Sequence, residues 1–298
     1  MANNLSREYL KLHISVMLAG LTGILGKLIT MDAVFLVWYR LIFAFSLFYL
    51  ILLLFKKIPK EKLFDILKLS LLGAVLGLHF LFFFASVKFA NVAVGVVCYS
   101  LEGFFTAILE PIIYKKSVSI NNLLYSLIAV GGICFIFQVD VSFRFGIFLG
   151  IISAILIALY TILNKVVSVG KSFRSVLFYE LFGGALLLSF IIGILIFAGL
   201  TTFQLPSGSD FLYLFVLSFF CTIGLYMLQI QVLRTLSAFT VSLYGNFEPI
   251  YGILLAVIFL GEGKQLNFEF YIGMTLILLS VILQSSYQRE NCLEKILK

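Results

Sequence analysis

Long apolar runs separated by short polar breaks make up most of this chain. About 20 consecutive apolar residues are needed to cross a bilayer as a helix, and on that rule the runs predict ten membrane-spanning helices. They cover residues 11–29, 34–55, 67–87, 92–114, 120–139, 146–166, 174–199, 211–233, 239–260 and 270–286. The connections are mostly short and leave no room for a soluble domain. The pattern therefore predicts an all-α membrane protein.

The polar positions inside these runs also suggest an internal repeat. A shift of 146 residues superimposes five polar pairs: Lys88 on Arg234, Glu102 on Glu248, Asn121 on Asn267, Tyr125 on Tyr271 and Gln138 on Gln284. Five helices in each half would give the halves opposite orientations in the membrane, an arrangement that recurs in secondary transporters. We predict two inverted five-helix repeats, residues 1–142 and 143–298, with a site near mid-membrane between them.

Composition and charge agree with this picture. The chain is 62% hydrophobic and 12% charged, and its mean hydropathy is +1.14, values typical of polytopic membrane proteins. Most of the basic residues fall in the tails and in the loops after even-numbered helices, which places both termini in the cytoplasm. The net charge of +7 is then a topology signal and not a nucleic-acid-binding surface. The expected environment is a bilayer, specifically a bacterial inner (plasma) membrane.

One acidic side chain interrupts the ninth predicted helix. Glu248 lies within an apolar run and is followed by Pro249, which cannot donate a hydrogen bond to the carbonyl of Gly245. A carboxylate at mid-membrane costs about 2.5–3.5 kcal/mol, so such residues usually face a cavity or a partner. Glu102 is its counterpart in the fourth helix. Both could line a cavity and one could bind a proton, or each could simply hold a broken helix together.

Two sets of motifs give the chain a family resemblance. In the second half these are Asn246-Phe-Glu-Pro249, Ile258-Phe-Leu-Gly-Glu262 and Tyr271-Ile-Gly273; in the first half they are Lys27 and Trp38-Tyr-Arg40-Leu. With them the sequence resembles drug/metabolite transporters built from two EamA-like repeats. The resemblance implies a ten-helix carrier whose fourth and ninth helices line a central cavity. Such carriers move amino acids, nucleotide-like metabolites, sugars or xenobiotics, commonly outward.

The first half departs from the motif, because Gly103 stands where the proline would be and Lys116 where the glutamate would be. Whether the fourth helix is kinked is therefore open, and Pro111 could move a kink further along.

Other buried polar residues have two interpretations each. Arg40 could bind a substrate carboxylate or phosphate, or it could pair with Asp32, Glu102 or another buried acid. Glu180 is expected to pair structurally with Arg174 or Lys171. A lone histidine such as His79 is more often a packing residue than a proton relay. The predicted substrate-binding residues are Glu248, Glu102, Arg40, Asn246, Ser100, Tyr99, His79 and Tyr244.

These observations favour a secondary active transporter that moves a small, amino-acid-like metabolite by alternating access. Export follows from the family resemblance, and coupling to a proton or another gradient is left open. An uptake or exchange carrier for an anionic metabolite, such as a nucleotide or sugar phosphate, is the alternative. An enzyme is disfavoured because there are only two histidines and no clustered acid–base motif; a channel is disfavoured because no filter loop repeats. No cofactor or metal is expected, and the protein would act as a monomer or homodimer.

Spaced glycines mark the helix faces expected to pack closely. Gly73-x-x-x-Gly77 and Gly146-x-x-x-Gly150 have the small-residue spacing of close helix crossings in membranes.

Overall fold

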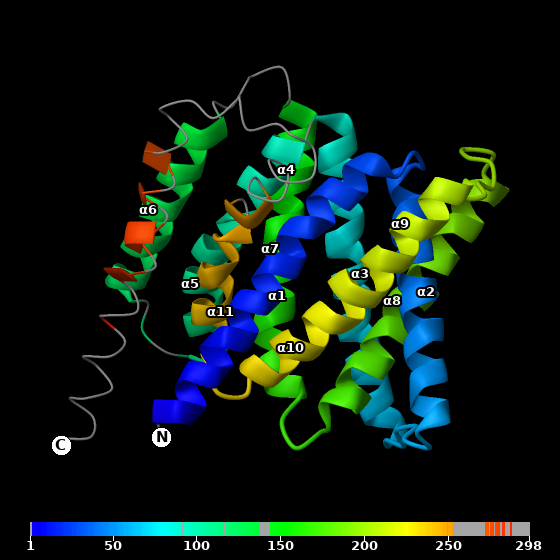
Figure 1. Ribbon diagram of the computed structural model, residues 1–298, viewed down its shortest axis with the longest axis horizontal. Helices are drawn as coiled ribbons and strands as arrows, with labels where there is room; N and C mark the ends of the chain where they lie inside the picture. The colour runs from blue at the N-terminus through cyan, green and yellow to red at the C-terminus, as the bar shows by residue number, and fades with distance from the viewer. Residues whose placement is uncertain are drawn as a thin grey trace.

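The structure is a computed structural model of the chain, and every regular element in the part that it describes is helical. It describes residues 2–90, 92–115, 117, 119–137, 144–248, 250–252 and some positions between 272 and 287. The elements are α1 (Ala2–Leu28), α2 (Ala33–Leu54), α3 (Leu63–Phe89), α4 (Val92–Tyr99), α5 (Leu101–Ile113), α6 (Ile120–Phe137), α7 (Arg144–Val167), α8 (Phe173–Phe197), α9 (Gly208–Ser218), the π-helix η2 (Phe219–Gly224), α10 (Leu225–Val232) and α11 (Ala238–Gly245). Figure 1 shows them as a bundle of long helices.

Six stretches within these residues are long and apolar enough to cross a membrane. They are Ser6–Leu28, Ala33–Leu54, Leu63–Phe89, Arg144–Val167, Phe173–Phe197 and Gly208–Val232. They correspond to six of the predicted spans, so the chain is an all-helical multi-pass membrane protein. Most of the last two predicted spans, 239–260 and 270–286, lies outside the described residues. The count of ten helices and the inverted repeat remain predictions.

Helix α3 is the central element, and it packs along both α7 and α8. The crossing with α8 is close because glycines meet backbone on each side. A Cβ added to Gly73 would lie 1.9 Å from the carbonyl oxygen of Glu180, and one added to Gly183 would lie 2.0 Å from that of Ser70. A Cβ on Gly146 of α7 would likewise lie 2.5 Å from the Cβ of Ala90. The predicted glycine contacts are confirmed at both helices.

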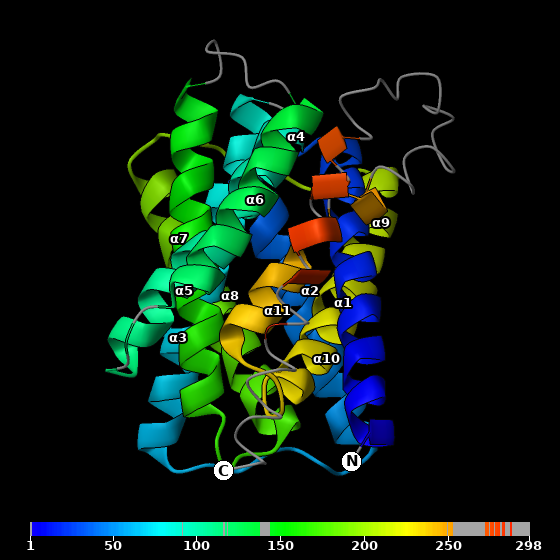
Figure 2. The same ribbon diagram turned by 90° about the vertical axis from the view of Figure 1, so that its left-hand side faces the viewer.

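Two of the predicted spans are interrupted. The span predicted as a single helix over 92–114 is divided at Ser100 into α4 and α5, and α5 continues through Pro111 to Ile113. Helix α11 ends at Gly245, three residues before Glu248, and is followed by i→i−3 hydrogen bonds from the amides of Asn246 and Phe247. Figure 2 shows α11 between α5 and α1, and it contacts both helices. Ser100 and Asn246 are the positions that the 146-residue shift superimposes.

The loops form two separate groups at opposite ends of the bundle (Figure 1). At one end Lys171 forms ion pairs with Asp65 (2.7 Å) and Glu61 (3.7 Å), and Arg234 donates to the carbonyl of Lys171. The hydrogen bond with Asp65 raises the pKa of Lys171, which lies in the α7–α8 connection. Lys171 was expected to pair with Glu180, and that expectation is wrong, because Lys171 reaches α3 instead.

At the other end, the α1–α2 turn is tied to the start of α9. Asp210 accepts from the amide of Thr30 (2.9 Å) and from its hydroxyl (2.8 Å). Asp32 accepts a hydrogen bond from Gln204, and Lys88 donates to the carbonyl of Ile29 (2.8 Å).

Candidate functional site

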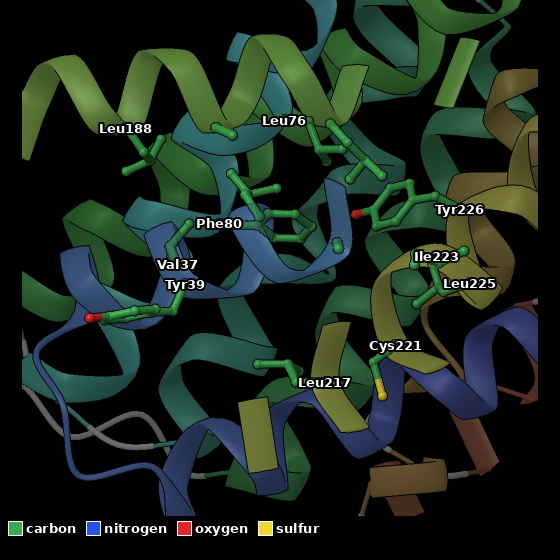
Figure 3. Close-up of a cluster of buried hydrophobic side chains, with 14 of the residues drawn as sticks. Val37, Tyr39, Leu76, Phe80, Leu188, Leu217, Cys221, Ile223, Leu225 and Tyr226 are labelled. Atoms are coloured by element: carbon green, nitrogen blue, oxygen red, sulfur yellow. The ribbon is translucent and has the colours of Figure 1, made fainter. Parts of the chain in front are cut away.

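A small cavity of about 30 Å³ lies among α1, α2, α3 and α10, close to the helix breaks. Its walls come mostly from apolar and aromatic side chains, with a few convergent polar groups, which is the usual make-up of a small-molecule site. The lining residues are Ala19, Thr22, Arg40, His79, Phe80, Phe83, Tyr99, Leu225, Tyr226, Gln229 and Glu248. Figure 3 shows three of them, Phe80, Leu225 and Tyr226; the rings of Phe80 and Tyr226 meet edge to face, with their centroids 5.7 Å apart.

Arg40 is the one buried arginine at this cavity, and only 1% of it is exposed. Its Nε donates to the hydroxyl of Thr222 and its Nη2 to the carbonyl of Cys221, both at 2.8 Å. The guanidinium lies 3.8 Å from the centre of the Phe80 ring, a cation–π contact. Its Nη1 is buried and has no hydrogen-bond partner among the described residues.

The structural alternative for Arg40 was an ion pair with a buried acid, and no such pair occurs among the residues that the structure describes. Asp32 is hydrogen-bonded to Gln204. Glu102 is held by neutral hydroxyl groups. Neither acid therefore supplies the hydrogen-bond partner that Nη1 of Arg40 lacks.

Glu248 lines the same cavity and is 5% exposed. No described residue donates a hydrogen bond to its carboxylate. Glu248 lies about one turn beyond the end of α11, so its carboxylate lies at the cavity wall just after the helix break. The prediction that a charge in the middle of an apolar span faces a cavity therefore matches its position.

Glu102 lies outside the cavity lining, although it is equally buried. Its carboxylate accepts hydrogen bonds from Ser242 (2.6 Å) and Thr161 (3.0 Å). These donors come from α11 and α7, so Glu102, on α5, ties three helices together near the break between α4 and α5. Tyr99, at the end of α4, lines the cavity.

His79 also lines the cavity, from the middle of α3. Its Nδ1 is engaged with Ser153 of α7, at 2.9 Å from the hydroxyl and 3.0 Å from the carbonyl. The packing interpretation thus explains one ring nitrogen. The other, Nε2, has no hydrogen bond to a described residue.

Three further predicted residues do not line the cavity. Ser100 is buried at the break between α4 and α5. Asn246 is 1% exposed, and neither atom of its side-chain amide has a hydrogen-bond partner among the described residues. Tyr244 packs instead in an aromatic cluster with Tyr9, His13 and Phe247.

Glu180 was expected to pair with Arg174 or Lys171, and this was wrong. It is fully buried between α7 and α8, where it accepts from Asn164 (2.7 Å) and Tyr160 (3.0 Å). Burial explains the difference, because the carboxylate of Glu180 is enclosed against α7 and its partners are neutral groups of that helix.

Sequence reasoning missed the groups that hold Arg40. Thr222 and the carbonyl of Cys221 lie in η2, and Thr22, Tyr226 and Gln229 complete the polar lining. Thr22 and Gln229 are polar residues inside apolar runs, which is a signal that could have been used. The π-helical turn has no comparable signature in Phe219–Gly224.

A bundle of apolar spans around a buried cavity that contains charged side chains is the architecture of a membrane transport protein. The model of the EamA-like transporter family matches the chain twice, over residues 7–138 and 144–286, and the chain therefore belongs to the EamA-like transporter family. A solved structure titled "Crystal structure of protein" has the same fold, with a TM-score of 0.73 at 15% sequence identity over 95% of this chain and 99% of that one. A search among curated proteins finds no match.

Proposed function

We propose that this protein is a secondary transporter that carries a small zwitterionic, amino-acid-like metabolite through the cavity between its two halves. The observation that carries the proposal is a pair of opposite charges at one cavity, Arg40 and Glu248. Nη1 of Arg40 has no hydrogen-bond partner among the described residues, and Arg40 and Glu248 form no ion pair with each other. A ligand with a carboxylate and an ammonium group would pair with both charges.

Unpaired charge is costly in apolar surroundings. Charged groups buried in a membrane protein are usually paired or face a functional cavity. Arg40 and Glu248 lie at the same cavity without forming an ion pair with each other. Phe80, Phe83 and Tyr226 would contact an apolar or aromatic side chain.

Transport would follow by alternating access. The halves 1–142 and 143–298 would rock around the central site, opening it to one side of the membrane at a time. We favour export from the cytoplasm across a bacterial inner membrane, as the family resemblance implies. Glu248 would take up a proton when the substrate leaves, because burial disfavours an unpaired carboxylate, and this would couple transport to the proton gradient.

A second candidate is uptake or exchange of an anionic metabolite. The free Nη1 of Arg40 favours it, since guanidinium binds carboxylate and phosphate. The carboxylate of Glu248 in the same cavity argues against a ligand with only negative charge, unless Glu248 is protonated.

Three related probes distinguish these possibilities. L-phenylalanine carries both charges, phenethylamine only the ammonium and 3-phenylpropanoate only the carboxylate. We expect L-phenylalanine to raise the melting temperature of the purified protein most. Arg40→Gln should weaken the two carboxylate probes by about tenfold or more, the size expected from one charged hydrogen bond. Glu248→Gln should weaken the two ammonium probes by a similar factor.

Lys27→Gln is the matched control, because Lys27 is an exposed cation on α1, outside the cavity. It should leave all three responses unchanged. Counterflow of L-phenylalanine in proteoliposomes, with and without a pH gradient, then tests transport and coupling. If no amino acid binds or moves, and 3-phenylpropanoate or a sugar phosphate does, the anionic alternative replaces the zwitterion.

A further inference from the structure

We infer that Thr222, in the π-helical turn η2, is the positioning residue that holds the guanidinium of Arg40 in the orientation that receives a substrate carboxylate. The inference rests on the proposed function, because it explains how the cation of that site is aimed. Thr222 is fully buried and does not itself line the cavity, so it would act through Arg40.

The π-turn makes the contact possible. In an α-helix each carbonyl accepts from the amide four residues later, whereas a π-turn uses the fifth residue and widens the backbone locally. Within η2 the amide of Leu225 bonds the carbonyl of Phe220, five residues back. The carbonyl of Cys221, next along the chain, accepts from Nη2 of Arg40. A side chain from α2 thereby reaches a backbone acceptor inside another membrane span.

Two hydrogen bonds and one ring then fix the plane of the guanidinium. Nε is held by Thr222 and Nη2 by Cys221, while the ring of Phe80 covers one face at 3.8 Å. A guanidinium is planar and rigid, so fixing two of its nitrogens also fixes the third. The third is Nη1, the atom without a described partner. The turn thus presents Nη1 as the free donor of the site.

The hydroxyl of Thr222 has two roles that only a hydroxyl can combine. It accepts from Nε of Arg40 at 2.8 Å, and it donates to the carbonyl of Leu217 at 2.9 Å. A serine could make both bonds, whereas valine has the same shape and can make neither. Without the hydroxyl, Nε loses its acceptor and the guanidinium is free to turn about its side-chain bonds, so that Nη1 is no longer held in place.

Ser218 provides a matched control one turn earlier. Its hydroxyl is also buried and also bonds Arg40, but it donates to the backbone carbonyl at 2.9 Å and does not contact the guanidinium. Removing the Ser218 hydroxyl perturbs the same helix contact but leaves the orientation of the Arg40 guanidinium unchanged.

The test compares apparent affinities from ligand-dependent melting of the full-length protein. The probes are L-phenylalanine and phenethylamine, which lacks the carboxylate. We expect Thr222→Val to weaken L-phenylalanine by about tenfold and phenethylamine by less than twofold, while Thr222→Ser restores the L-phenylalanine affinity. Ser218→Ala should affect the two probes equally. Thr222→Ala serves as a second hydroxyl deletion if the valine variant does not fold.

Two outcomes overturn the inference. One is an unchanged L-phenylalanine affinity in both hydroxyl deletions. The other is an equal loss for both probes, which is what a merely structural threonine would give. Failure of the proposed function is separately visible, since Arg40→Gln would then also leave the binding of L-phenylalanine unaltered.

Discussion

Glu102 and Glu248 are both glutamates and both buried, yet their surroundings indicate different roles. Two hydroxyl groups from two other helices donate to Glu102, whereas the carboxylate of Glu248 receives no described hydrogen bond and borders the cavity. A buried acceptor that loses its donors, or donors that lose their acceptor, cost about 1–3 kcal/mol each. Glu102 should therefore matter for stability, and Glu248 for binding.

The corresponding prediction compares the two amides. Glu102→Gln turns one acceptor into a donor that faces hydroxyl groups, and we expect it to destabilise the protein by about 1–3 kcal/mol. Glu248→Gln removes no described hydrogen bond and should leave the melting temperature of the ligand-free protein nearly unchanged. Thermal unfolding in detergent measures both. Thr161→Val, which deletes a single donor to Glu102, should fall between them; the reverse order of the two amides would refute this division of roles.

The residues of the candidate site were predictable where a polar residue stands inside an apolar run. Arg40, His79 and Glu248 were found in this way, because burial of such groups needs a reason. The contacts of Arg40 were not predictable. They depend on the carbonyl of Cys221, which is a backbone group. They also depend on the π-helical turn over Phe219–Gly224, which the residue types there do not predict.

Among the described elements, α3 and α8 cross so closely that only glycine fits at Gly73 and Gly183. Backbone oxygens lie where the Cβ atoms of Gly73 and Gly183 would be, so alanine at either position must separate the two helices. We expect Gly73→Ala and Gly183→Ala each to destabilise the protein by about 1–3 kcal/mol, as overpacking does. Unfolding temperatures in detergent or in nanodiscs check this.

Gly193→Ala is the control on the same helix. No atom lies within 4 Å of a Cβ added there, and alanine favours a helix more than glycine does. Its melting temperature should stay the same or rise. A fall as large as that of Gly183→Ala would mean that glycine matters in α8 through the backbone and not through packing.

The sequence predicts the bounds of a helix well where the length of an apolar run determines them. It does not predict where a span is interrupted. Runs of more than 20 apolar residues gave α2, α3, α7 and α8 to within a few residues. The break at Ser100 was missed as a position, since Gly103 and Pro111 were the residues that drew attention. Helix α11 likewise ends before Pro249 is reached, so proline alone does not mark the break.

At the scale of the whole molecule, the basic loops predicted to share one side of the membrane lie together. The α2–α3 and α7–α8 connections meet through the ion pairs of Lys171, and Arg234 joins them. The α1–α2 and α8–α9 connections lie at the opposite end (Figure 1) and are joined by the hydrogen bond from the amide of Asp32 to Gln204. Positive loops are retained in the cytoplasm, so the end that contains Lys171 should be cytoplasmic.

Cysteine labelling tests this orientation. A cysteine at Lys57 lies in the basic α2–α3 connection, and one at Thr201 lies in the α8–α9 connection at the other end. In intact cells a membrane-impermeant maleimide should label Thr201→Cys and should reach Lys57→Cys only after permeabilisation. The unsubstituted chain controls for its own cysteines. Labelling of Lys57→Cys in intact cells, with Thr201→Cys protected, would invert the molecule and would turn the proposed export into uptake, because the gradient acting on Glu248 would then run the other way through the same site.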